Sequence, residues 1–164
     1  MSYNFEFNTS LVHEKLLSNL TPDLENCLKE IAPIIMPHLR KVTDAFYVKL
    51  LTIPVTSDFL MAYNDKLDSL KATHLAWLTS LFVRNIDAEF AQEMRKIGDV
   101  HVAVHLPLEF MSSAMSLINA ELIKVVIETL GDNKALCLRA LLAINAVTGM
   151  TLILMQKSYQ LWDA

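Results

Sequence analysis

The chain has 164 residues and a mass of 18.5 kDa, with 53% hydrophobic, 8% aromatic and 20% charged residues. This length fits a single domain over residues 1–164, and the apolar content excludes a disordered chain. The formal net charge of -4 and the lack of a basic run argue against DNA or RNA as a partner.

The predicted elements are all helices, because only three glycines and five prolines occur and no long stretch alternates apolar and polar residues. The first begins at Thr21-Pro22-Asp23, where a hydroxyl cap, a proline and an acid are typical of a helix start. It ends near Pro37. Further helices are expected at about 38–52, 57–63, 64–82, 87–106, 108–130 and 133–161.

This pattern predicts an all-α fold of about eight helices. The last two helices are the longest, and Gly131-Asp132-Asn133 joins them with a glycine stop followed by a new cap. Short helices early and long helices late indicate crossed packing rather than an up-down bundle.

The cysteines and the hydropathy pattern indicate the cellular compartment of the protein. Cys27 and Cys137 lie far apart and form no CxxC pair, which fits a reducing compartment better than a disulfide scaffold. The N-terminal segment carries charges and no uninterrupted apolar core, so we expect no secretory signal. The best membrane candidate, 140–155, is shorter than the roughly 20 residues of a spanning helix. We therefore expect a cytoplasmic protein without a membrane span.

Enzyme motifs are scarce. The sequence contains no GxSxG, GxxxxGK, HExxH or GxGxxG, so we expect no hydrolase or nucleotide-dependent enzyme. His101 and His105 are four residues apart, a spacing that brings two imidazoles onto one helix face and suits a divalent metal. Neither Asp99 nor Glu109 has the spacing of a third ligand. The alternative for His101 is a histidine that fills the core.

The chemistry of haem favours the ligand interpretation of His101. Haem needs a neutral imidazole on the iron, a flat apolar slot, and a hydrogen-bond donor on the opposite face to polarise dioxygen. The sequence has candidates for all three.

Three segments carry a resemblance to a known family: the aromatic pair Phe46-Tyr47 with the apolar residues after it, LKATHLAWLTSLF at 70–82, and HVAVHLP at 101–107. The order and spacing of these segments, over about residues 24–159, resemble those of the globin-coupled sensors. The haem-binding domain of that family is a variant globin fold.

The resemblance implies that His101 is the proximal ligand of a haem b iron. It also implies that Tyr47 is the distal residue whose hydroxyl donates a hydrogen bond to dioxygen. Leu70 falls where the family has a gating leucine, and Thr73 where some members have a second hydroxyl donor. A phenol is a good donor to a partially negative dioxygen. The alternative for Tyr47 is a surface tyrosine that packs beside Phe46.

The chain departs from the family at two positions. Ala103 stands where a basic residue is common, and His105 where a small residue is common. The resemblance also implies a homodimer through the last two helices, which are apolar on more than one face. Members commonly precede an output module, such as a diguanylate cyclase or a methyl-accepting signalling domain. This chain ends at Ala164, so it is either an excised domain or a stand-alone sensor.

The preferred interpretation is a non-enzymatic haem-based sensor of O2, with CO or NO as alternative ligands, that relays ligation through its C-terminal helices. One alternative is a haem-free globin-like signalling or interaction module, which holds if His101 merely fills the core. The other is a haem enzyme, such as a peroxidase or an NO dioxygenase, which needs an electron supply. The colour of the purified protein separates the haem-free alternative from the other two.

Overall fold

The computed structural model describes residues 7–160, with side chains from residue 11 onward, and it contains no strand in that range. The prediction of an all-α chain is confirmed. In chain order the elements are α1 (Phe7–Leu17), α2 (Pro22–Ile35), the 3-10 turn η1 (Met36–His38), α3 (Leu39–Thr52), α4 (Pro54–Met61), the 3-10 turn η2 (Asn64–Lys66), α5 (Leu67–Val83), α6 (Ala88–Ala103), α7 (Leu108–Leu130) and α8 (Lys134–Gln160).

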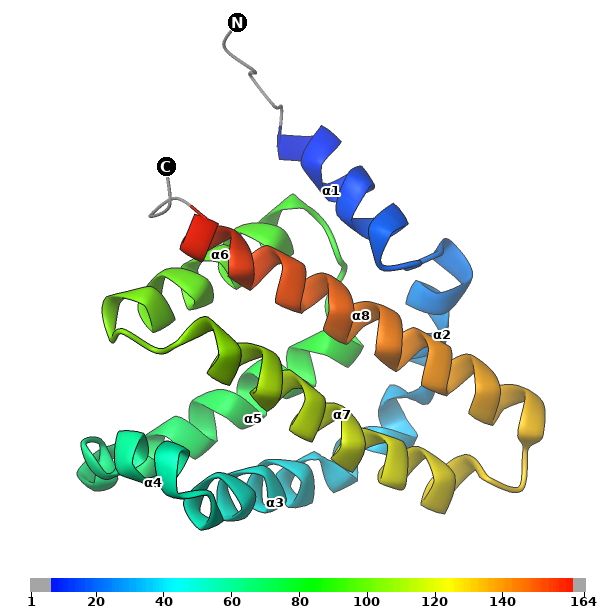
Figure 1. Cartoon of the computed structure of the whole chain (residues 1–164). Coiled ribbons are helices and arrows are strands. Elements are labelled where there is room, and N and C mark those ends of the chain that lie inside the picture. Colours follow the sequence, from blue (N-terminus) through cyan, green and yellow to red (C-terminus); the bar gives the residue numbers. More distant parts are fainter. Residues whose placement is uncertain (1–6, 161–164) are drawn as a thin grey trace, which may run out of the picture.

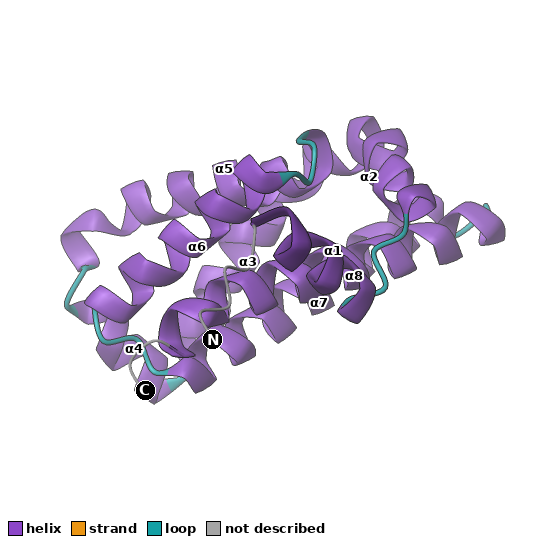
Figure 2. Ribbon diagram, turned by 90° about the horizontal axis from the view of Figure 1, so that it is seen from above, coloured by secondary structure: helices purple, strands orange, loops and turns teal. Residues whose placement is uncertain are grey.

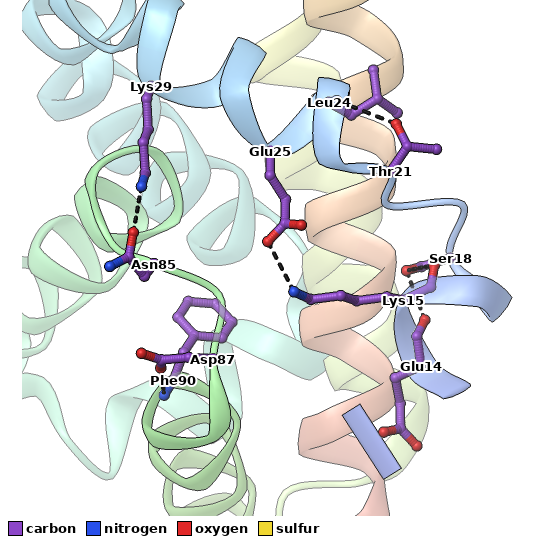
Figure 3. Close-up of polar contacts among 10 residues, drawn as sticks. All are labelled: Glu14, Lys15, Ser18, Thr21, Leu24, Glu25, Lys29, Asn85, Asp87 and Phe90. Carbon is purple, nitrogen blue, oxygen red and sulfur yellow. Dashed lines mark hydrogen bonds and ion pairs between the residues drawn. The ribbon is translucent and has the colours of Figure 1, made fainter. Parts of the chain in front are cut away.

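Side-chain caps set several helix boundaries, as the sequence predicts. The Thr21 hydroxyl accepts a hydrogen bond from the backbone N–H of Leu24 at 3.2 Å, and the Asp87 carboxylate accepts one from Phe90 at 3.0 Å (Figure 3). Asn133 caps α8 in the same way. Each cap satisfies a backbone donor that the first turn of a helix leaves unpaired.

Two predicted boundaries are wrong by about one turn. The helix expected at 57–63 begins at Pro54, because the extended backbone of Ile53 lets this proline occupy the first helical position. The helix expected to run to Leu106 ends at Ala103, because His105 takes a left-handed conformation with φ of 58°.

Helix α1 is an element that the sequence analysis did not predict. Its boundary signals are weak, and Leu16 and Leu17 leave apolar side chains exposed. Polar contacts attach it to the domain. The Lys15 ammonium lies 2.9 Å from the Glu25 carboxylate of α2 (Figure 3), and the buried Glu14 pairs with Lys157 of α8.

Helix α8 is the centre of the packing. It lies across the domain in Figure 1 and packs against α1, α2, α6 and α7, while α3 packs against α4, α5 and α7. The helices therefore cross, as expected, rather than run as an up-down bundle. The largest fully buried side chains come from six of the helices: Phe82, Phe90, Leu28, Ile31, Ile35, Leu39, Leu78, Leu81, Met94, Leu122, Ile144 and Met150.

By length and composition alone, α7 and α8 could each cross a membrane. Both are packed helices of this fold, and Ile144 of α8 is 1% exposed. Apart from Leu108 at the start of α7, their exposed large apolar residues lie near the connection between the two helices. They form what we call the α7–α8 patch, which consists of Ile123, Ile127, Leu138 and Leu142.

Gly98 allows α6 to approach α8 closely. A Cβ atom at this position would lie 2.3 Å from the Met155 carbonyl oxygen and 2.7 Å from the Ser158 hydroxyl oxygen. The Ser158 hydroxyl in turn donates a hydrogen bond to the carbonyl of Arg95 at 3.1 Å. The backbones of the two helices therefore pack with no room for a side chain at Gly98.

We predict that Gly98→Ala lowers the free energy of unfolding by about 1–3 kcal/mol, because the added methyl group forces α6 away from α8. Chemical unfolding followed by circular dichroism measures this. Gly149→Ala is the matched control, because its Cβ would meet only the Ser18 Cβ at 3.9 Å, and it should be neutral or stabilising by up to about 1 kcal/mol. Equal stability of the two variants would refute the close-approach argument.

Candidate functional site

Helix α3 places two aromatic residues of the predicted site against α5. Tyr47 is 7% exposed, and its ring lies 5.3 Å from the Phe46 ring in an edge-on arrangement. Tyr47 is therefore not a surface tyrosine. Burial raises the pKa of its phenol, so the hydroxyl stays protonated at neutral pH and remains a donor. Among the described residues this hydroxyl has no hydrogen-bond partner.

His74 of α5 lies beside Tyr47 and completes an aromatic cluster. Its ring stacks on Phe46 with centroids 4.9 Å apart and meets the Tyr47 ring edge-on at 5.7 Å. Its Nδ1 is 2.9 Å from the Thr43 hydroxyl oxygen. Burial lowers the pKa of the imidazole from 6.5 to about 4, so His74 is neutral at physiological pH.

The other ring nitrogen of His74, Nε2, is buried and has no hydrogen-bond partner in the part of the chain that the structure describes. An unpaired buried polar atom costs about 1–3 kcal/mol, so native proteins rarely leave one without a function. The sequence analysis did not assign His74 to the site. Its position four residues after Leu70, on the same stripe of α5, is the signal that could have found it.

Leu70 and Thr73 differ in their surroundings. Leu70 is half-buried and packs against the core. Thr73 lies one turn along α5 from Leu70 on an exposed edge, while the next residue, His74, contacts Tyr47. The structure thus brings His74 next to Tyr47 and leaves Thr73 in solvent.

On α6, His101 is half-buried, and its Nδ1 donates a hydrogen bond to the Ile97 carbonyl oxygen at 2.7 Å. A carbonyl oxygen can only accept, so this bond places the proton on Nδ1. The lone pair of Nε2 is then free to bind a metal ion. Such an outer hydrogen bond is the usual support of a metal-ligating histidine.

His105 does not share a helix face with His101. It is exposed, follows the end of α6 and has a φ of 58°. The N–H of Leu106 bonds to the His101 carbonyl at 3.0 Å and the His105 N–H to that of Val102 at 3.0 Å, which is the hydrogen-bond pattern of a Schellman helix end. The paired-imidazole metal site is therefore not formed, and the described residues contain no cluster of three metal-ligating side chains.

From the end of α5 the chain turns back, and α6 runs in roughly the opposite direction (Figure 1), with the two helices next to each other in the view of Figure 2. The Trp77 indole nitrogen donates to the Met94 sulfur at 3.3 Å and joins the two helices near their connection. His74 is about one turn from Trp77, and His101 is about two turns from Met94 on the same helix face. His74 and His101 thus lie on the helix faces of Trp77 and Met94, the pair that joins α5 to α6.

These residues fit a haem group. His101 offers an imidazole whose Nδ1 is hydrogen-bonded to the backbone. Tyr47 and His74, on α3 and α5, offer polar atoms without hydrogen-bond partners among the described residues. Half-buried apolar side chains suit the porphyrin. On α5, α6, α7 and the connection from α6 to α7 they include Leu67, Leu70, Ile97, Leu106 and Leu117.

A separate surface hollow of about 220 Å³ lies between α2 and the connection from α5 to α6. Its lining includes Glu25, Lys29 and Arg84, and none of the candidate haem residues. It is small for a cofactor site, since such sites usually measure about 300–1,000 Å³. We therefore do not assign the function to this hollow.

Comparison with known proteins identifies the family. The sequence matches the Protoglobin family model over residues 8–161. The globin domain of the Geobacter sulfurreducens globin-coupled sensor is similar, with a TM-score of 0.82 and 26% identity over 91% of this chain and 97% of that one. The ferric globin domain of E. coli DosC has the same fold, with a TM-score of 0.72 and 18% identity over 89% and 99% of the chains. Comparison with curated proteins finds no match.

The resemblance to globin-coupled sensors and the predicted globin-like fold are both confirmed by these matches. A globin fold implies haem binding, which agrees with the chemistry of the residues described above. Because the family model covers nearly the whole chain, the chain belongs to the Protoglobin family and is a globin domain of the sensor type.

Proposed function

We propose that the chain is a haem-based gas sensor that binds haem b through Nε2 of His101 and takes O2 as its ligand, with CO and NO as competitors. The hydrogen bond from His101 Nδ1 to Ile97 carries this proposal. It fixes the tautomer that a metal ligand needs, and it orients the ring. If His101 only filled the core, its Nε2 would not need to be free of a hydrogen bond.

Bound haem would supply an iron atom that binds a histidine and a diatomic gas. Tyr47 holds a protonated hydroxyl in an apolar environment, where a hydrogen bond to a polar ligand is stronger than in water. Leu70 restricts the access of the gas as a gating residue. The resemblance places a second donor at Thr73, and because Thr73 lies at the exposed edge of α5 we expect it to contribute less than Tyr47.

The signal leaves through the contact of α6 with α8. Gly98 lies three residues before His101 and touches Met155 and Ser158, so a displacement of His101 acts on the C-terminal part of α8. Such a shift between two packed arrangements is how ligation is relayed to an output, such as a diguanylate cyclase or a methyl-accepting signalling domain. A non-enzymatic, cytoplasmic role is supported by the sensor globin domain to which the chain is similar.

We propose a homodimer whose interface is the α7–α8 patch. Its four residues are 45–59% exposed, although they are large and apolar. Two copies of α7 and α8 would bury them in a four-helix arrangement. Ile144 is not an interface position, because it is buried within one chain.

The haem ligand is tested with His101→Ala. We expect this variant to lose haem or bind it weakly, because α6 carries no other histidine. Absorption spectra of the ferric and ferrous protein after haem reconstitution measure the effect. His105→Gly is the control, since glycine suits the left-handed helix end, and it should keep the wild-type spectrum. An unchanged spectrum in His101→Ala would show that the wrong histidine was chosen.

The distal hydrogen bond is tested with Tyr47→Phe. Removing a bond of about 1–2 kcal/mol should speed O2 dissociation roughly fivefold to thirtyfold. Dissociation of CO should change much less, because bound CO is less polar. Stopped-flow measurements give both rates, with Thr73→Ala as the control for the second donor. Equal effects on the two gases would indicate altered packing and contradict the role of Tyr47.

The interface is tested with Leu138→Glu and Ile127→Glu. Each should convert a dimer into a monomer, because burying an unpaired carboxylate is unfavourable. Light scattering at micromolar concentration measures the mass. Val55→Glu on α4 is the matched control, since Val55 is 57% exposed outside the patch. A monomeric wild-type protein would refute the proposed dimer.

A further inference from the structure

Two neighbouring hydroxyl groups near the end of α8 bind backbone carbonyls on either side of His101. The Ser158 hydroxyl donates a hydrogen bond to the Arg95 carbonyl at 3.1 Å, on the N-terminal side of His101. The Tyr159 hydroxyl donates one to the Leu106 carbonyl at 2.8 Å, on its C-terminal side. The proposed function uses the contact of Ser158 and leaves the bond of Tyr159 without a role.

Leu106 joins the Tyr159 bond to the backbone of His101. Its N–H donates to the His101 carbonyl at 3.0 Å, while its own carbonyl accepts from the Tyr159 hydroxyl. One residue therefore connects the backbone of the candidate haem ligand to α8 through two hydrogen bonds.

The backbone on both sides of Leu106 is restricted. His105 has a φ of 58°, in the small left-handed region that a residue with a side chain can enter. The ring of Pro107 fixes its φ, which is -58°, and leaves it no N–H to donate. A displacement of His101 is therefore passed to the Leu106 carbonyl, because the connection from α6 to α7 has little freedom to absorb it.

The Tyr159 side chain is itself held in place. Its ring is half-buried and packs against the core. Burial raises the pKa of the phenol, so the hydroxyl stays protonated at neutral pH and remains a donor. A movement of Leu106 therefore acts on a side chain that is fixed to α8.

We propose that Tyr159 is a positioning residue for His101, whose hydroxyl holds His101 through Leu106 in its gas-free position and so opposes gas binding. This inference rests on the proposed function, because it requires haem on His101. Coupling between two sites is reciprocal, so gas binding weakens the Tyr159 bond by the same factor by which that bond lowers the affinity for gas.

The test uses Tyr159→Phe, which keeps the ring and removes only the hydroxyl. In the haem-reconstituted protein the affinity for O2 and for CO should rise alike, by about threefold to tenfold, because a net hydrogen bond is lost. The two gases respond alike because Tyr159 acts through His101 and not on the gas. The iron–histidine stretching frequency of the gas-free ferrous protein, measured by resonance Raman spectroscopy, should rise as the restraint on His101 is released.

Gln156→Ala is the matched control. The Gln156 side chain donates to the Ser112 hydroxyl of α7 at 3.0 Å, from the same turn of α8 as Tyr159. Its loss removes a bond to α7 and leaves the bond to Leu106 intact, so both affinities and the stretching frequency should stay at their wild-type values. Circular dichroism confirms that each variant is folded.

A second measurement needs no variant. Amide hydrogen exchange in the last turn of α8 and in the connection from α6 to α7 should be faster in the CO-bound wild-type protein than in the gas-free protein. The expected factor is again about threefold to tenfold, because gas binding weakens the Tyr159 bond. Equal exchange in the two states would overturn the inference.

The outcomes separate this inference from the function on which it rests. A haem-bound Tyr159→Phe with unchanged or lower gas affinities overturns the inference and keeps the sensor proposal. An equal effect in Gln156→Ala indicates a general loosening of α8 and also overturns it. A wild-type chain that binds no haem refutes both proposals.

Discussion

The contact of Gly98 with the Met155 carbonyl is the constraint on which the geometry of the site depends. A glycine is required there because any Cβ would overlap with the backbone of α8. The contact fixes α6 on the central helix of the domain, and the Tyr159 hydroxyl holds the end of that segment by donating to the Leu106 carbonyl at 2.8 Å. His101 lies between these two attachments. The contacts of this segment with α8 therefore fix the position of His101.

Desolvation determines the protonation states of His74 and Tyr47, which lie on α5 and α3. Burial favours the neutral form of each group, so it lowers the pKa of His74 to about 4 and raises that of Tyr47. At neutral pH the contact between α3 and α5 therefore holds a neutral imidazole, that of His74, and a protonated phenol, that of Tyr47. Neither carries a charge, and both can interact with a polar gas. A charged side chain in the same place would instead favour ligands of opposite charge.

The sequence predicts much of this fold, because caps and prolines act locally. Thr21, Asp87 and Asn133 each cap the helix that was expected to follow them. Helix α1 escaped prediction because polar contacts such as that of Glu14 with Lys157, 143 residues away, attach it to the domain. The place of His74 in the site was missed for a related reason. It depends on a nitrogen left unpaired by tertiary packing and on Thr43, 31 residues earlier, and neither is visible in a local pattern.

Helix α8 connects the two surfaces that a sensor of this kind needs. Its contact with α6 is at Met155 and Ser158, near its C-terminal end, whereas Leu138 and Leu142 of the α7–α8 patch are near its start. At 1.5 Å per residue, these sites are about 20–30 Å apart along one continuous helix. A shift of α6 acts directly on the last two turns of α8, and it reaches the patch only if the whole helix moves as a rigid body. In a dimer held at the patch, the C-terminal ends of α8 are then the parts freest to move.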